Sequence, residues 1–477
     1  MKTLKASLAI FCFSFALHAA GTWILPLIDR DEPRFAEAAR EMIQRSDYVV
    51  PTFNNTSRFD KPPLIYWGQV LSYKAFGEND FAARFPSVLA ASLLALVIFG
   101  WGLRLYDEKT AFWSAVIFTT SLHTLLLAKA AVADMALCLF FTLSLWAGWE
   151  VLSSTAKKAW WAFYLSLAFS FLAKGPVALL PVVAILVFAK ISGAPSIHKK
   201  MRWVRGMFVV LFSVGLWAVP ALVQSHGEYF AVGIGKHIVG RSLSPMQGHG
   251  PEGLKNWLLF LPFYFLTVFI SFYPWSFFIP ALIKHFKKNE NHRPKEIYLL
   301  ICIFILFAVF TPLKTKLPHY IFPALPALSL LLAGFWFKEK KGRALLIFFA
   351  AAMAASAFVI SFAGFSVASR YLPAKHLYQK SASVLKPEME FASLDFNEPS
   401  LVWYFRNAVR GFHVQMQTPQ EIADFMKKPG PRFAVLSDKS FDSISQEIDP
   451  AWKISSQKGF NIATGKEADL KMIVKDN

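Results

Sequence analysis

Residues 29–82 contain a cluster of charged side chains suited to chemistry. Asp31, Glu32 and Arg34 lie in the run Asp-Arg-Asp-Glu-Pro-Arg, directly after a long apolar stretch. Asp31 suits the N-cap of a helix and Pro33 its first turn. The plain alternative is that Asp31 only caps this helix and that Glu32 and Arg34 form a surface pair. A carboxylate here could also orient or deprotonate a hydroxyl or amine.

Lys61 stands in Phe-Asp-Lys-Pro-Pro, just before a second expected helix. A cation near a helix N-terminus is unfavourable for the helix dipole unless an anion is held there. Pro62 and Pro63 remove two backbone donors, so the lysine would carry more of the anion binding. The alternative is that Lys61 extends to lipid headgroups.

Further charged residues mark the ends of other apolar stretches. Asp134 opens one such stretch, where a carboxylate is costly and often functional, and Lys129 is a candidate partner. Lys174 ends another stretch in Leu-Ala-Lys-Gly-Pro, and Lys316 and Tyr320 lie in Lys-Thr-Lys-Leu-Pro-His-Tyr. The alternatives are an N-cap role for Asp134 and simple snorkelling for Lys174. Together these residues suit a lipid phosphate that carries a polar head.

Residues 225–255 contain histidines and glycines, among them Arg241 and His249. With a carboxylate such as Asp60, a histidine of this segment could hold a metal ion, although the spacing is not diagnostic. Arg241 could add a positive charge for an anion. The three cysteines all lie inside apolar runs, which indicates neither a metal cage nor a disulfide framework.

The elements that must position these residues are membrane-spanning helices. The 477 residues are 55% hydrophobic and 17% charged, more apolar and less charged than a soluble domain. Apolar runs of roughly 20 residues match the thickness of a bilayer. We expect about eleven spans, at 6–28, 83–105, 110–128, 134–153, 158–174, 176–191, 205–224, 256–283, 297–313, 318–337 and 343–368. The two around Gly175-Pro176 could be one broken span, and the first is expected to be an uncleaved anchor.

The net charge of +19 has the same explanation. The basic residues lie mostly in short loops on one side of the expected spans, which is the positive-inside pattern, so no nucleic acid partner is indicated. The segment 29–82 then faces the outer side. Its first helix is expected to be amphipathic and to lie in the membrane interface. One side carries apolar residues and the other charged ones: Phe35, Ala38, Ala39, Met42 and Ile43 against Arg34, Glu37, Glu41 and Arg45.

The composition changes near residue 372, where charged residues become frequent and apolar runs short. Residues 433–436 and 472–474 have the pattern of strands, and 418–427 that of a capped helix. We therefore predict a transmembrane domain over 1–371 and a small extracytoplasmic α/β domain over 372–477.

The ordered motifs resemble those of integral-membrane glycosyltransferases of the GT-C type. The nearest likeness is to bacterial lipid A aminoarabinose transferases and protein O-mannosyltransferases, over residues 20–330. The resemblance is carried by Asp-Glu-Pro-Arg-Phe-Ala-Glu, Phe-Asp-Lys-Pro-Pro, Val-Ala-Asp, Leu-Ala-Lys-Gly-Pro and Lys-Leu-Pro-His-Tyr-Ile-Phe-Pro. Each motif is weak alone, and the ordered set is fairly specific.

This resemblance implies a multi-pass inner-membrane enzyme whose active site faces the periplasm. It would transfer a sugar, with inversion, from a polyprenyl-phosphate donor to lipid A or a related glycolipid. It implies no obligatory cofactor and allows a divalent metal. The roles carried over are as follows: Asp31 and Asp134 as functional carboxylates, Glu32 and Arg34 in support, Lys61, Lys174 and Tyr320 at the donor phosphate, and Asp60 with His249 at a metal. From the residues alone, Arg241 joins the phosphate ligands and Lys316 supports them.

Three positions depart from the family's pattern, namely Phe35, Arg58 and Asp60. They bear on the sugar and the acceptor more than on the reaction type. A protein acceptor is therefore the alternative within enzymes. A transporter or flippase of lipid-linked sugars is the alternative of another class, and it would place charges at the midplane of paired broken helices.

Overall fold

The computed structural model describes residues 2–153, 157–193, 197–233, 235, 253–288 and 293–476. The chain divides into two compact units. The first comprises Met1–Ala20, Phe59–Ile65 and Arg84–Phe358, and the second comprises Gly21–Arg58, Tyr66–Ala83 and Val359–Asn477. Most of the expected first outer segment therefore groups with the C-terminal tail. The domain boundary at residue 371 stays a prediction.

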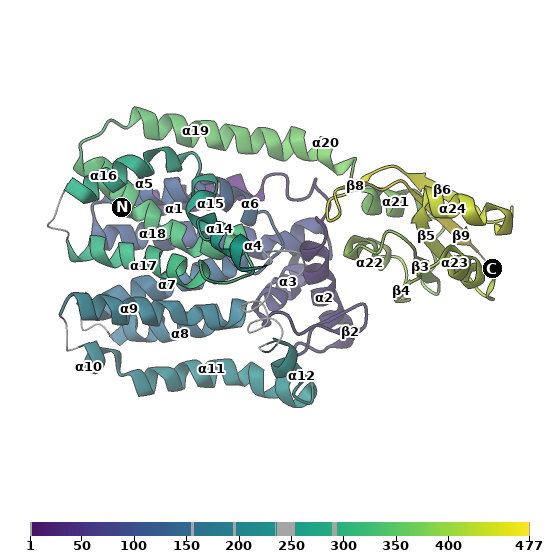
Figure 1. Cartoon of the computed structure of the whole chain (residues 1–477), viewed down its shortest axis with the longest axis horizontal. Coiled ribbons are helices and arrows are strands. Elements are labelled where there is room, and N and C mark those ends of the chain that lie inside the picture. Colours follow the sequence, from purple (N-terminus) through teal and green to yellow (C-terminus); the bar gives the residue numbers. More distant parts are fainter. Residues whose placement is uncertain are drawn as a thin grey trace. The chain divides into compact units, whose positions relative to one another are not determined.

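In the part of the first unit that the structure describes, the regular elements are all helices, joined by turns and loops. Its elements are α1 (Lys2–Ala19), α4 (Asp80–Leu105, mostly in this unit), α5 (Glu108–Thr119), α6 (Leu122–Leu127), α7 (Asp134–Ser153), α8 (Lys157–Lys174), η1 (Gly175–Leu179), α9 (Leu180–Ile191), α10 (Ile197–Met201), α11 (Trp203–Gln224), α12 (Glu228–Phe230), α14 (Leu254–Leu259), α15 (Phe263–Ser271), η3 (Trp275–Phe278), α16 (Ile279–Lys288), α17 (Pro294–Phe310), η4 (Pro318–Ala324), α18 (Leu325–Lys338) and α19 (Ala344–Val359). Helix α8 packs against α7 and α11, and α17 against α9 and α18 (Figure 1).

Among the residues that the structure describes, six helical stretches are long and apolar enough to cross a membrane, or seven if the bent pair Phe263–Ser271 and Trp275–Lys288 is one span. This confirms a polytopic membrane protein, while the expected count of eleven stays a prediction. The two spans expected around Gly175 form one 35-residue stretch, Lys157–Ile191, which η1 interrupts. The interruption follows from Gly175, whose φ of +76° leaves the helical region.

Close contacts of small residues hold this bundle together. A Cβ atom added at Gly206 of α11 would lie 1.9 Å from Cζ of Tyr164 on α8. The Tyr164 hydroxyl donates to the carbonyl of Met201, the last residue of α10, at 2.8 Å, which holds the ring near the start of α11. Only glycine permits this approach of the two helices.

The described part of the second unit combines helices with a five-stranded mixed sheet and two small sheets, β1-β2 and β7-β8. Its elements are α2 (Asp31–Arg45), β1 (Thr52–Phe53), β2 (Thr56–Ser57), α3 (Leu64–Phe76, mostly in this unit), η5 (Ile360–Gly364), α20 (Phe365–Ser369), α21 (Pro373–Ser381), β3 (Glu390–Ser393), α22 (Pro399–Phe405), β4 (His413–Gln415), α23 (Pro419–Lys427), β5 (Arg432–Ser437), α24 (Asp438–Ile444), η6 (Ser445–Glu447), β6 (Lys453–Gln457), β7 (Phe460–Asn461), β8 (Lys466–Glu467) and β9 (Leu470–Lys475).

The five-stranded sheet has the order β4-β3-β5-β9-β6. Strand β3 pairs in parallel with β4 and β5, whereas β9 is antiparallel to β5 and β6. The strands and the helix expected from the sequence are therefore present as β5, β9 and α23. Thr418 caps α23 and accepts from the backbone N–H of Glu421 at 3.3 Å. Apolar residues of β3, β5 and β9 pack with α23 and α24 into one buried cluster.

Candidate functional site

Helix α2 begins with the acidic motif, and its geometry differs from the expectation. Asp31 is the first helical residue rather than the N-cap, which is Arg30, and Arg30 makes no side-chain cap bond. Glu32 Oε2 accepts from the backbone N–H of Ile28 at 2.8 Å and therefore satisfies a donor that precedes the helix. The Asp31 side chain is exposed. Asp31 is thus free of the capping role that the sequence first suggested.

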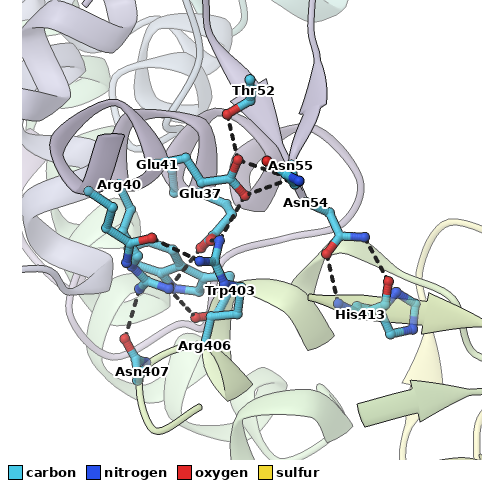
Figure 2. Close-up of polar contacts among 12 residues, drawn as sticks. Glu37, Arg40, Glu41, Thr52, Asn54, Asn55, Trp403, Arg406, Asn407 and His413 are labelled. Atoms are coloured by element: carbon cyan, nitrogen blue, oxygen red, sulfur yellow. Dashed lines mark hydrogen bonds and ion pairs between the residues drawn. The ribbon is translucent and has the colours of Figure 1, made fainter. Parts of the chain in front are cut away.

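The charged side of α2 is not exposed at Glu37 and Glu41, and the predicted position of this helix in the membrane interface stays a prediction. Both side chains are buried, at 0% and 1% exposed. They belong to a network of charges between α2 and the tail helix α22 (Figure 2). Burial of these carboxylates is possible because arginine side chains neutralise them inside the unit.

Two arginines carry this network. Arg406 donates from Nη1 to Glu37 Oε1 at 2.7 Å and to Glu41 Oε1 at 2.8 Å. Arg40 donates from Nη1 to Glu37 Oε2 at 2.7 Å and to the Trp403 carbonyl at 2.8 Å, and its guanidinium carbon lies 3.8 Å from the centre of the Trp403 ring. Figure 2 shows these contacts converging from α2 and the tail. The helix that starts with Asp31 is therefore fixed to the tail by charge pairing.

Asp29 supplies a second connection just before α2. Its two carboxylate oxygens accept from the backbone N–H and the hydroxyl of Ser400, at 2.9 and 2.5 Å. Burial raises the pKa of Asp29 from 3.8 to about 7, and the hydrogen bonds from Ser400 oppose part of this shift. Arg30 donates to Glu398 at 3.2 Å in the same junction.

The first unit brings several of the other predicted residues together. Lys174, the last residue of α8, donates from Nζ to Asp134 Oδ1 at 2.5 Å, and Asp134 is the first residue of α7. Lys61 and His319 lie close enough to Asp134 to act on it electrostatically. The Lys174 ammonium lies 5.9 Å from the centre of the Tyr320 ring. We call Lys61, Asp134, Lys174, His319 and Tyr320 the lysine–aspartate cluster.

The suggested partnership of Lys129 with Asp134 is wrong. Lys129 Nζ donates to the carbonyls of Leu17 and Ala20 at 2.7 and 2.6 Å, and it therefore caps the C-terminal end of α1. Burial lowers the pKa of Lys129 to about 7. The partner of Asp134 is Lys174, 40 residues further along the chain.

Lys316 and Lys61 differ in their surroundings. The buried Lys316 donates to the carbonyl of Thr311, the C-cap of α17, and lies 5.3 Å from the centre of the Tyr264 ring. Lys61 is half-buried and donates to the carbonyl of Asp60 at 3.0 Å, and its own carbonyl accepts from the Tyr229 hydroxyl. Lys316 is thus placed to hold its own turn, whereas Lys61 acts on Asp134.

The predicted metal site cannot be located in the described part of the chain. Arg241 and His249 lie outside the described residues, so the metal pairing of Asp60 with His249 stays a prediction. Within the ranges that the structure describes, no three His, Cys, Asp or Glu side chains are grouped to hold a metal. His319 also belongs to the cluster, although the charged-residue motifs do not predict it as a site residue. Its signal was present, since it directly precedes Tyr320 in the Lys-Leu-Pro-His-Tyr run.

The arrangement is suited to holding a phosphate. An ammonium has three donors, and Asp134 takes one of those of Lys174, which leaves others for an incoming oxygen. Asp134 also restrains the long lysine side chain before a ligand arrives, so less entropy is lost on binding. The aromatic ring of Tyr320 borders the same ammonium.

Comparison with known proteins indicates a glycosyltransferase, as the sequence motifs do. Residues 60–217 match the family described as dolichyl-phosphate-mannose-protein mannosyltransferase, and this range includes Lys61, Asp134 and Lys174. The chain also resembles proteins named undecaprenyl phosphate-alpha-4-amino-4-deoxy-L-arabinose arabinosyl transferase. The one from Edwardsiella ictaluri is 30% identical over 342 residues, 68% of this chain and 59% of that protein. The one from Yersinia enterocolitica is 29% identical over 354 residues, 70% of this chain and 60% of that protein.

Solved structures agree on the fold. ArnT from Cupriavidus metallidurans, crystallised with undecaprenyl phosphate, superposes with a TM-score of 0.75 at 18% identity, covering 99% of this chain and 98% of that chain. An oligosaccharyltransferase from Archaeoglobus fulgidus gives 0.52 at 12% identity, covering 95% and 69%. The resemblance to GT-C type glycosyltransferases is thus confirmed. Within that class the chain is similar to the aminoarabinose transferases, although it spans only 58–60% of the length of the first curated relatives.

Proposed function

We propose that this protein is an inverting glycosyltransferase that moves a sugar from a polyprenyl-phosphate donor to an acceptor on the outer side of the bacterial inner membrane. The observation that carries the proposal is the Asp134–Lys174 ion pair at the ends of two apolar helices, with Lys61 and Tyr320 beside it. Ionisable residues at the ends of membrane-spanning helices are costly and by default indicate a functional site. A polyprenyl phosphate is the ligand class of the relatives named above.

The assigned roles follow from charge. Lys61 and Lys174 stabilise the negative charge that develops on the departing phosphate, an effect that is largest in a site shielded from water. Asp134 holds Lys174 in place, and Tyr320 borders the phosphate. We assign Arg241 to the same phosphate, and Lys316 to support of the turn that precedes Tyr320.

At the acceptor we assign Asp31. It accepts a proton from the acceptor oxygen or orients that oxygen, with Glu32 and Arg34 in support. If the acceptor is a phosphate that is already ionised, Asp31 positions it rather than deprotonating it. A single displacement at the anomeric carbon breaks the bond to the donor phosphate and forms the bond to the acceptor, so the configuration inverts.

We propose lipid A or a related glycolipid as the acceptor, because the resemblance to aminoarabinose transferases covers more of the chain than the family match over 60–217. That family's description names a protein acceptor, and this supports a protein O-glycosyltransferase as the second candidate.

Mass spectrometry of lipid A from cells with the gene, without it, and with Asp31→Ala tests the proposal. We expect a sugar-sized mass that is present with the wild-type gene and absent in both other strains. An unchanged lipid A profile in the deletion strain would exclude lipid A as the acceptor. A mass lost in the deletion strain but retained in Asp31→Ala would refute the role of Asp31.

A further inference from the structure

The second unit contains a cavity of about 260 Å³. Its walls come from four separate segments, namely the start of the unit at Trp23, residues 78–81, helix α21 and the end of α22 with the turn that follows. It is distinct from the lysine–aspartate cluster, which belongs to the first unit. A volume of about 260 Å³ lies near the lower end of the range of about 300–1,000 Å³ that small-molecule pockets have, so the cavity suits one small ring.

The charges around the cavity are already paired. Asp80 accepts from Lys375 Nζ at 2.7 Å through one oxygen, and from Trp403 Nε1 and the Tyr404 hydroxyl at 3.1 and 3.0 Å through the other. Among the described residues that line the cavity, Lys375 provides the one ammonium, and it is therefore bound to a buried carboxylate. A second carboxylate, Glu78, lines the same cavity. A phosphate or other anion would meet two carboxylates here, so the cavity is unsuited to the donor phosphate.

Polar groups with spare hydrogen-bonding capacity face the same space. Arg40 donates from Nε to Glu78 Oε2 at 2.8 Å, and Glu78 Oε1 has capacity to accept from a ligand. Asn407 accepts from Arg40 Nη2 at 2.7 Å through Oδ1, and its amide nitrogen can donate. Gln379 lies exposed in the lining, and in the described part of the chain no hydrogen bond engages its amide. One carboxylate and two amides thus offer both donors and acceptors.

An aromatic wall completes the cavity. Trp23 is 50% exposed and packs edge-on against Phe362, with ring centres 6.1 Å apart. The exposed half of the Trp23 indole, beside a polar cavity, can therefore pack against a flat partner that has an apolar face. Specific small-molecule sites combine apolar and aromatic walls with a few polar groups that fix orientation. A sugar ring matches each feature, since it has a C–H face for the indole and hydroxyls for carboxylate and amides.

We propose that this cavity binds a single uncharged sugar ring, and that this ring belongs to the acceptor. The second part rests on the proposed function. Glu78 and Asn407 both bind Arg40, which in turn binds Glu37 on α2. A ring held in the cavity therefore contacts the charge network that fixes the helix beginning at Asp31, and it adds specificity to acceptor selection.

Saturation-transfer NMR on the full-length protein tests the binding. The protein is kept in amphipol, because sugar-based detergents carry the same class of headgroup. Methyl β-glucopyranoside is the probe, and methyl phosphate is the anionic comparison. We expect transfer to the glucoside, with its apparent Kd weakened on the order of fivefold by Gln379→Ala or Trp23→Ala. Gln417→Ala and Trp161→Ala are the matched controls, since both residues are exposed and lie outside the cavity lining. They are expected to leave the Kd unchanged.

Two results would overturn the binding proposal. One is the absence of transfer to the glucoside in the wild-type protein, and the other is equal transfer in the cavity variants and the controls. Stronger binding of methyl phosphate, with the same dependence on Gln379 and Trp23, would show an anion site instead.

A transfer assay separates this proposal from the proposed function. We expect Gln379→Ala to raise KM for the acceptor severalfold while kcat stays within twofold of the wild-type value. Glucoside binding in a protein that transfers no sugar would refute the proposed function and leave the cavity as a sugar site. Normal transfer with an unchanged acceptor KM in both cavity variants would refute the acceptor assignment alone.

Discussion

Replacing Arg406 tests how strongly the tail holds the helix that begins at Asp31. The Arg406 side chain is 5% exposed and donates to Glu37, Glu41 and Gln44. In Arg406→Met, the buried Glu37 and Glu41 carboxylates are left with one guanidinium, that of Arg40. Removing one partner of a buried ion pair typically costs about 3–5 kcal/mol. We expect the free energy of unfolding of this unit to fall by that amount.

The size of the effect follows from what remains around Glu41. Its carboxylate keeps a hydrogen bond from the Thr52 hydroxyl at 2.6 Å and one from the backbone N–H of Asn55 at 3.2 Å, neither of which carries charge. Arg406→Lys retains a cation but loses the planar fork that reaches the two glutamates and Gln44, so an intermediate loss of about 1–3 kcal/mol is expected. Adding Glu41→Gln to Arg406→Met removes the uncompensated charge and should restore part of the loss.

Thermal unfolding of the purified protein, followed by circular dichroism, is the assay. For a unit of this size, about 3–5 kcal/mol corresponds to a decrease in Tm of roughly 6–20 °C. Lys427→Met is the control, because it breaks the exposed pair with Glu447 and should leave Tm unchanged. Equal Tm values for Arg406→Met and Lys427→Met would refute the argument that buried charge pairing fixes α2 to the tail.

Three other predictions follow from the same structure. Lys174→Met should reduce sugar transfer, measured with a radiolabelled donor, by about 100-fold or more, because it removes a donor to the developing phosphate charge. Adding Asp134→Asn should restore the thermal stability that Lys174→Met loses, but not the transfer activity. Burial raises the folded pKa of Asp29 to about 7, above its unfolded value, so stability should fall by up to about 1.4 kcal/mol per pH unit between pH 4 and 7. Asp29→Asn should flatten that slope in denaturant melts, and an unchanged slope would contradict the assignment. Gly206→Ala should destabilise the first unit by about 1–3 kcal/mol through overlap with Tyr164, seen as a lower Tm, whereas Gly215→Ala, where the added Cβ meets no atom within 4 Å, should not.

Much of the fold could be predicted from local patterns. The apolar runs identified a polytopic membrane protein because the length of a spanning helix is set by bilayer thickness. Strands β5 and β9 and helix α23 were also recognisable, since alternation and the Thr418 cap are local features. The number of spans was not, because a break such as Gly175 does not reveal whether a stretch crosses once or folds back.

The candidate site was predictable only in part. The motifs containing Lys61, Asp134, Lys174 and Tyr320 identified residues that the first unit brings together, because a charge at the end of an apolar helix is conspicuous in sequence. The suggested partner of Asp134, Lys129, lies near it in sequence, whereas the fold pairs Asp134 with the more distant Lys174.

The sequence by itself therefore determined the class of protein and the chemistry of its charged residues, since helix length, residue type and motif order are local properties of the chain. Only the tertiary structure decided what surrounds them. The charged side of α2 has the pattern of a surface exposed to water or headgroups, yet Glu37 and Glu41 are buried. The reason is Arg406, more than 360 residues away in the sequence, whose charge compensates a desolvation cost that no local pattern could predict.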